Sequence, residues 1–253
     1  MSTVIEHPAA KADPFWAERV DLACAFRLAY RNNWHEGVSN HFSLSVSEDG
    51  RKFLINPALR HFSRIRASEL LLVDADDPDV LTREAAPEAT AFGLHGGVHR
   101  TAPHARCALH VHSHYATALS TLADPSLPPL DQNCARFFNR VAFDAGYEGM
   151  AFGDEGERCA KQLGDKSILL MGNHGVLVCA DTVGIAFDRL YYFERAARTV
   201  ITAYATGRPL NPLSDAVAES TAQDWLGVEP TEGPRHFEAM RAILDEEDPE
   251  FRT

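Results

Sequence analysis

The sequence predicts one mixed α/β domain, and three observations support this fold class. Segments with the apolar period of an amphipathic helix are interleaved with short apolar runs of strand length. The 253 residues are 45% apolar and 24% charged, which is a globular composition. No internal repeat, low-complexity tract or linker interrupts the chain. We therefore expect one domain over 14–253, with a helical C-terminal tail, behind a flexible arm at 1–13.

In the first half of the chain, the spacing of apolar residues predicts both helices and strands. The strands at 42–47 and 52–56 alternate with period two around the turn Glu48-Asp49-Gly50, which is a hairpin pattern. Residues 67–73 lead into a run of Asp and Pro at 74–79, which we interpret as an exposed turn. The remaining elements are a helix at 14–31, a helix at 90–100 closed by Pro103, a buried strand at 107–112 and a helix at 115–122.

In the second half, two apolar strands are expected at 167–171 and 176–179, joined by the turn Gly172-Asn-His-Gly175. The longest helix is predicted at 182–206, where apolar residues recur with helical period before a Gly207-Arg-Pro stop. The other expected elements are a helix at 134–140, a strand at 141–144, a helix at 154–163 and an acidic, helical tail at 215–253.

The net charge and the positions of the cysteines indicate which kinds of partner and which cellular compartment to expect. Acidic residues outnumber basic ones by 36 to 24, and a net charge of −12 repels phosphate backbones and anionic membrane surfaces. The five cysteines are scattered and show no Cys-x-x-Cys spacing, so we interpret them as core thiols in a reducing compartment. We expect no signal peptide, because the first 14 residues lack an apolar stretch of that length, and no window of 18 apolar residues occurs in the sequence. We expect a cytoplasmic protein with a small-molecule substrate and neither a nucleic acid nor a membrane partner.

The histidines carry the chemistry that the sequence indicates. His110 and His112 end an apolar run, and residues i and i+2 of a strand point to the same face, so both imidazoles can reach one ion. His174 lies in a turn where Gly172 and Gly175 permit close backbone geometry. Three neutral imidazoles with an open position suit zinc, manganese or iron. The alternative is that these are surface histidines or core histidines with hydrogen-bond partners.

Several stretches together resemble the class II aldolase and adducin family over roughly residues 15–210. The resemblance implies a three-layer α/β/α sandwich with a mainly antiparallel central sheet, and often a fourfold tetramer with active sites between subunits. It also implies that His110, His112 and His174 bind a divalent metal ion. The stretches that carry it are Gly37-Val-Ser-Asn-His-Phe-Ser43, Phe53-Leu-Ile-Asn-Pro57, Cys107-Ala-Leu-His-Val-His112, Tyr147-Glu-Gly149, Leu169-Leu-Met-Gly-Asn-His-Gly175 and Tyr192-Phe-Glu-Arg195.

The sequence departs from the sugar-phosphate aldolases of this family at the general base. Those enzymes place a glutamate four residues before a helical histidine, whereas here Ala91 precedes His95. Glu88 would replace that glutamate only if the helix start shifted, and otherwise it is a first-turn acid favoured by the helix dipole. The base of the aldol mechanism is therefore expected to be absent.

A second departure concerns the phosphate site. Phosphate-binding members have a glycine where this chain has Leu59, and paired serines where it has Ala89-Thr90. Asn40 occupies the matching asparagine position. We therefore expect no phosphate cradle, and we take Asn40 and Asn56 as candidates for binding a substrate carboxylate or hydroxyl.

These losses favour one reaction over another. Retro-aldol cleavage needs a base as well as a metal, whereas decarboxylation next to an electron sink leaves a metal-stabilised enolate and needs only a proton donor afterwards. We therefore expect a metal-dependent lyase that cleaves a carbon–carbon bond of a small oxygenated acid, with decarboxylation preferred over aldol-type cleavage. The alternatives are a non-haem iron oxygenase that uses the same three histidines, and a non-catalytic interaction module like the adducin head.

Two further residues are candidates for catalysis. His114 shares the face of His110 and His112 if the strand continues, but it turns away if a helix begins at Ser113. Asp131 either lines a pocket or caps the next helix. We expect structural roles for the others: His61, His99 and His104 as surface or capping residues, Glu194 with Arg195 as a buried ion pair, and Tyr191 and Tyr192 as core or interface aromatics.

Overall fold

The computed structural model describes residues 12–146 and 155–253, which form helices around a seven-stranded sheet. The strand order is β3-β2-β1-β4-β7-β6-β5, and only the β5–β6 pair is parallel within the described ranges. The strands are β1 (His41–Ser45), β2 (Lys52–Ile55), β3 (Leu71–Asp74), β4 (Cys107–Val111), β5 (Val141–Asp144), β6 (Ile168–Met171) and β7 (Gly175–Ala180). The helices are α1 (Trp16–Arg31), α2 (Ala89–Thr101), α3 (His114–Ser120), α4 (Gln132–Arg136), α5 (Glu155–Leu163), α6 (Val183–Ala205) and α7 (Asp215–Glu247).

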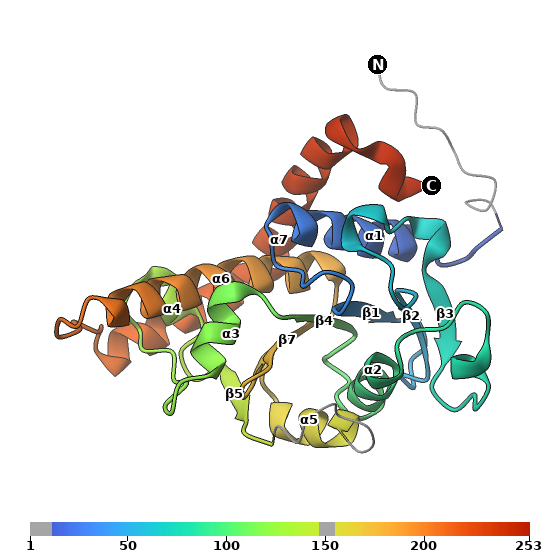
Figure 1. The fold of residues 1–253 in the computed structure, drawn as a ribbon. Coiled ribbons are helices and arrows are strands. Elements are labelled where there is room, and N and C mark those ends of the chain that lie inside the picture. The colour runs from blue at the N-terminus through green and yellow to red at the C-terminus, as the bar shows by residue number, and fades with distance from the viewer. Residues whose placement is uncertain (1–11, 147–154) are drawn as a thin grey trace.

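Helices cover both faces of the sheet. In Figure 1, α1 and α6 lie above the sheet and α2 and α5 lie below it. Helix α3 packs on β6 and β7 and against α6, on the same side as α6. This confirms the predicted three-layer α/β/α sandwich with a mainly antiparallel sheet. Because both faces are covered, β4, β6 and β7 are nearly continuous apolar runs.

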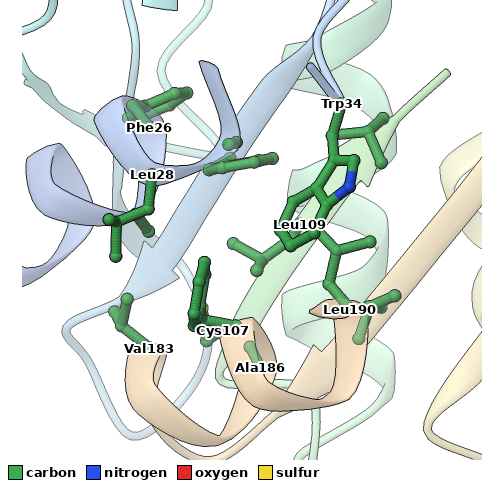
Figure 2. Packing of buried hydrophobic residues seen from close by; sticks show 14 of the residues in the cluster. Phe26, Leu28, Trp34, Cys107, Leu109, Val183, Ala186 and Leu190 are labelled. Atoms are coloured by element: carbon green, nitrogen blue, oxygen red, sulfur yellow. The ribbon is translucent and has the colours of Figure 1, made fainter. Parts of the chain in front are cut away.

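The main core lies between the sheet and the α1–α6 layer. Side chains from α1, β4 and α6 meet there, and Figure 2 shows Phe26, Cys107, Leu109 and Leu190 among them. Each of these four side chains is fully buried. All five cysteines are buried and free, as expected for core thiols. In the part of the chain that is described, every helix is too short or too polar to cross a bilayer.

The C-terminal tail folds back as α7 and lies along α6. Buried charges hold it there, because Arg136 of α4 bonds Glu229 of α7 at 3.0 Å and Asp188 of α6 as well. Arg189 also bonds the Glu229 carboxylate. Such a network is costly to break once it is buried, since a lone partner would be left uncompensated.

One strand was not expected from the sequence, and the burial of a second depends on a neighbouring helix. The run that leads into the exposed turn contains a strand, β3, which pairs with β2 at the edge of the sheet. The four apolar residues at 70–73 are followed at once by the Asp- and Pro-rich run, and only Val73 of β3 is buried, as suits a short strand at the edge of the sheet. Strand β1 is buried along its whole length although Ser43 and Ser45 alternate with apolar residues, because α2 supplies polar partners on the serine face. Most of the arm expected at 1–13, the first residue of the helix expected at 154–163 and the stretch Tyr147-Glu-Gly149 lie outside the described residues.

Candidate metal centre

Three histidines from two separate parts of the chain meet at one end of the β4–β7 pair. His110 is near the end of β4, His112 follows that strand, and His174 lies in the turn before β7. One ring nitrogen of each lies within 4.8 Å of those of the other two, and the Nε2 atoms of His110 and His112 are 3.0 Å apart. The antiparallel pairing of β4 with β7 produces this convergence, because Val111 is opposite Val176 in the register.

Gly175 is required for this close approach. A Cβ atom at this position would lie 2.6 Å from the Val111 carbonyl oxygen and 2.8 Å from Cδ2 of His112. Any side chain here would therefore push β7 away from His112. The preceding Asn173 adopts a left-handed conformation with φ of 55°, which lets the turn place His174 opposite the other two rings.

Hydrogen bonds on the far side of two rings set their tautomers. Nδ1 of His110 donates to the Val176 carbonyl oxygen over 3.1 Å, and Nδ1 of His112 donates to the Glu36 carboxylate. Each Nε2 is then left with a lone pair that faces the shared point. Metal-binding histidines are usually oriented in this way by a carbonyl or a carboxylate.

Two of the rings, those of His110 and His174, are held near pH 7 in the neutral form that metal ligands need. Burial lowers the pKa of His110 well below its ordinary value of 6.5, and the neighbouring histidines lower it further. Burial and His112 lower the pKa of His174 to about 4. Three neutral imidazoles that converge on one point match the donor set of zinc, manganese or iron centres with open coordination positions.

Glu36 is a site residue that the sequence analysis missed. It lies in the irregular segment between α1 and β1, and its backbone N–H donates to Oδ1 of Asn40 over 2.6 Å. One sequence signal could have revealed it. Glu36 lies four residues before Asn40, in the loop that leads into the end of β1 nearest the three histidines. Asn40 thus orients the loop that brings the carboxylate to His112.

The two asparagines proposed for substrate binding occupy different environments. Asn40 is 2% exposed, and its Nδ2 has no hydrogen-bond partner in the described part of the chain. Asn56 accepts from the Phe42 N–H over 3.3 Å and donates to the Asn40 and Pro57 carbonyl oxygens, each over 3.4 Å. Asn56 therefore ties β2 to the start of β1, whereas Asn40 retains an unused donor.

His114 and Asp131 are not brought to the three-histidine cluster. Helix α3 begins at His114, so its exposed ring turns away and packs on Tyr115, 5.3 Å between centroids. Asp131 caps α4 by accepting from the Cys134 N–H over 2.8 Å, and its other oxygen accepts from the Thr199 hydroxyl over 3.0 Å. Of the two interpretations of Asp131, the structure shows the capping one.

Glu194 fixes the point at which β4 turns into α3. Its carboxylate accepts from the Ser113 hydroxyl and from the N–H groups of Tyr115 and Ala116, at 2.7 to 2.9 Å. The expected ion pair with Arg195 is wrong, because Arg195 is exposed while Glu194 is buried and capping a helix. This contact lies directly after His112 and so steadies the end of the ligand-bearing segment.

The position of the family's base holds no acid. Ala91 is buried in α2 and packs in a small apolar cluster. Glu88 caps this helix, accepting from the Ala91 N–H over 2.9 Å and from the Thr90 hydroxyl. Burial raises the pKa of Glu88, but these hydrogen bonds outweigh it and leave the pKa below its ordinary value. The carboxylate therefore serves the helix start, which is the first-turn role predicted for it.

Three other histidines have structural partners. His61 accepts from the Ser63 N–H over 3.3 Å, and His104 donates to the Lys166 carbonyl oxygen over 3.0 Å, in agreement with capping or surface roles. His99 differs, because it is only 5% exposed and hydrogen-bonded on both ring nitrogens. The surface or capping role expected for His99 is therefore wrong; its position near a polar helix end concealed that the ring points into the sheet.

Comparison with known proteins places this site in a family. Residues 20–201 match the family described as Class II Aldolase and Adducin N-terminal domain. An aldolase II superfamily protein from Pseudomonas syringae has a solved structure with a TM-score of 0.86 and 30% identity, covering 95% of this chain and 97% of that one. Decarboxylase NovR from Streptomyces niveus is 27% identical over 69% of this chain and 64% of its own length. The 4-hydroxy-3-prenylphenylpyruvate oxygenase/4-hydroxy-3-prenylbenzoate synthase from Streptomyces roseochromogenus subsp. oscitans is 28% identical over 74% of this chain and 68% of its own length.

The family match covers more than half of the chain, and the solved structure is similar over almost its full length. The resemblance first seen in the histidine-bearing stretches is thus matched by both sequence and fold. This chain belongs to the class II aldolase and adducin family.

Proposed function

We propose that this protein is a metal-dependent lyase that cleaves a carbon–carbon bond of a small oxygenated acid. The observation that carries the proposal is the convergence of His110, His112 and His174, whose ring nitrogens lie within 4.8 Å of one another. The orienting hydrogen bonds from His110 and His112 supply two of these rings in the tautomer that a cation needs. Zinc, manganese and iron all suit this donor set.

Each part of the site has a distinct task in such a reaction. A divalent ion bound here would supply a Lewis acid for negative charge that develops on a substrate oxygen. The three histidines hold the ion, and Glu36 keeps the His112 ring in place. The Nδ2 group of Asn40, which is buried and unpaired in the described chain, is the donor that we assign to a substrate carboxylate or hydroxyl.

Decarboxylation is the preferred form of cleavage. Removal of a hydroxyl proton needs a base, and α2 offers only Ala91 at that position and a Glu88 occupied by the helix cap. Loss of carbon dioxide needs no base to begin, and a relative 27% identical to this chain is named a decarboxylase. Aldol-type cleavage is the second reaction that the proposal includes.

An iron-dependent oxygenase is the second candidate function. The observation that favours it is a relative, 28% identical, whose name includes an oxygenase activity. Three neutral histidines with open positions also suit ferrous iron. Oxygen consumption separates the two candidates, because a lyase uses no oxygen. The non-catalytic alternative is disfavoured because an interaction module has no need to keep three oriented histidines.

The test combines metal analysis with a product screen. Protein purified without chelating resin is analysed for stoichiometric metal, and small hydroxy and oxo acids are screened for release of carbon dioxide or an aldehyde, with and without oxygen. We expect His112→Ala to abolish both bound metal and turnover, whereas the matched control His114→Ala, two residues away and exposed, keeps both. Stoichiometric metal or full activity in His112→Ala would refute the site. Light scattering on the same sample tests the proposed homotetramer.

A further inference from the structure

We propose that His41 is a substrate-binding residue of this centre, held by a buried hydrogen-bond chain in the tautomer that offers a bare Nε2 to a substrate hydroxyl. This inference rests on the proposed function, since it concerns which acid the metal centre accepts. It predicts a small acid that carries a hydroxyl group, because only a donor can pair with a bare ring nitrogen.

His41 lies next to the metal centre without belonging to it. It begins β1 and is the direct cross-strand partner of His110 in the β1–β4 register. Side chains of such partners stand on the same face of the sheet, and the two rings stack with centroids 4.8 Å apart at 29°. His41 is 6% exposed and is not among the three residues whose ring nitrogens converge. Its position therefore suits contact with a bound molecule.

A chain of hydrogen bonds runs from His41 through the interior between the sheet and α2. Nδ1 of His41 is 2.8 Å from Nε2 of His95, and Nδ1 of His95 is hydrogen-bonded to the Ser43 hydroxyl. The same hydroxyl is 2.7 Å from Nε2 of His99. Nδ1 of His99 is 2.9 Å from the Ala105 carbonyl oxygen, where the chain ends.

The carbonyl group at the end of the chain fixes the direction of every bond. A carbonyl oxygen only accepts, so Nδ1 of His99 carries the proton and Nε2 of that neutral ring is bare. The single hydroxyl proton of Ser43 must then go to His99, which obliges Nδ1 of His95 to donate to Ser43. By the same reasoning Nε2 of His95 is bare and accepts from Nδ1 of His41.

This reasoning requires that all three rings be neutral, and their burial ensures it. Burial lowers the pKa of His99 to about 4, with its bond to Ala105 acting in the opposite direction. Burial also lowers the pKa of His95 well below 6.5. His41 is 6% exposed and its Nδ1 pairs with a ring nitrogen of His95, not with a carboxylate, so its surroundings favour the neutral form as well. Near pH 7 each ring therefore carries one proton, and only one arrangement of these protons gives every hydrogen bond from His41 to Ala105 one donor and one acceptor.

The outcome is an acceptor beside the metal centre that has no partner of its own. Nε2 of His41 makes no hydrogen bond within residues 12–146 and 155–253. A hydroxyl group on the substrate would satisfy it, whereas an oxo group at the same place would set two acceptors against each other. Sites built to pair with a hydroxyl reject analogues that lack it.

The tautomer is measured directly by long-range ¹H–¹⁵N NMR on ¹⁵N-histidine-labelled protein, both metal-free and zinc-loaded. We expect His41, His95 and His99 all to be protonated on Nδ1, with His41 assigned from the signal lost in His41→Phe. Ser43→Ala should release His41 into a mixture of tautomers, while Ser43→Thr, which keeps the hydroxyl, should preserve the wild-type pattern. A protonated Nε2 on His41 in the wild-type protein would overturn the proposal.

Binding to zinc-loaded protein tests the substrate role, with glycolate as the probe and acetate as its analogue without the hydroxyl. We expect His41→Phe to weaken glycolate by about tenfold, the value of one hydrogen bond, and to leave acetate unchanged. An equal effect on both acids, no effect, or no glycolate binding by the wild type refutes the role. Zinc is quantified in each sample. A protein that binds none of zinc, manganese and iron defeats the proposed function, whereas bound zinc with the wrong His41 tautomer defeats only this inference.

Discussion

Removing the Glu36 carboxylate tests whether the centre depends on groups beyond its three ligands. Glu36 accepts the Nδ1 proton of His112 and so fixes the ring with Nε2 facing the shared point. In Glu36→Ala the His112 ring can rotate or change tautomer. In a fraction of the molecules its Nε2 lone pair then no longer faces the metal site. We expect the metal affinity to fall while the three ligands remain present.

The size of the loss follows from the exposure of the carboxylate. Groups that orient a metal ligand contribute roughly 10- to 100-fold in metal affinity. Glu36 is 65% exposed, and solvent screening weakens its interaction with His112, so we expect the lower end, about tenfold or about 1.4 kcal/mol. Glu36→Gln keeps an acceptor oxygen without the charge and should retain about half of this energy, for a loss of about threefold.

Zinc affinity is measured by competition with a chromophoric chelator. The matched control is Glu48→Ala, which removes the same charge from the turn at the opposite end of β1 and should leave the affinity unchanged. If Glu36→Ala binds zinc as tightly as the wild type, the orienting role of Glu36 is refuted. If Glu48→Ala weakens zinc equally, the effect is due to net charge and not to the position of the His112 ring.

Three further predictions concern stability, each read from denaturant unfolding. Leu190→Ala should lower the free energy of unfolding by about 2–5 kcal/mol, because the side chain is fully buried between α6 and the sheet; a loss below about 1 kcal/mol would contradict this packing. Leu59→Gly should stabilise the protein by about 0.5–1 kcal/mol, because Leu59 has φ of 60° and is 80% exposed; destabilisation would show that the leucine is not strained. Burial holds the pKa of His99 at about 4, below its ordinary 6.5, so unfolding becomes easier as pH falls from 6.5 and the loss levels off below 4. His99→Gln should remove about 3 kcal/mol of that pH-dependent loss, and an unchanged pH profile would contradict a neutral, buried His99.

The sheet and the convergence of the histidines could be predicted from the sequence, because both depend on the spacing of residues that are close together in the chain. Residues two apart on a strand share a face, which brings His110 and His112 together whatever the rest of the chain does. The glycines at 172 and 175 indicated a tight turn, and the structure places His174 in it beside the other two rings. The family and the fold class that these stretches indicated are both confirmed.

The contacts around the metal ligands could not be predicted from the sequence. They join residues that are far apart in the chain, and no periodic pattern relates such residues. Glu36 meets His112 across 76 positions, and Ser43 meets His95 across 52. Alternation at 42–47 predicted one strand of a hairpin, but a serine at every second residue does not tell whether its face meets solvent or another layer. The same pattern also arises when a second layer supplies buried hydrogen-bond partners, as α2 does here. The spacing of polar residues shows that one face of a strand is polar. It does not show whether solvent or another part of the protein covers that face.

Leu59 and Ala91, two of the residues at which this chain departs from the pattern of the sugar-phosphate aldolases, lie in different parts of the fold. Leu59 has a left-handed backbone with φ of 60°, a conformation that suits glycine, and presents its side chain to solvent. Ala91 leaves α2 in place, capped by Glu88, but removes the carboxylate. Neither a glycine nor a carboxylate stands at these two positions, which is why we propose a reaction that needs neither a phosphate cradle nor a base in α2. The oriented histidines and the hydrogen bonds that lead to His41 are the observations on which we base the proposed metal-centred reaction of a small hydroxy acid.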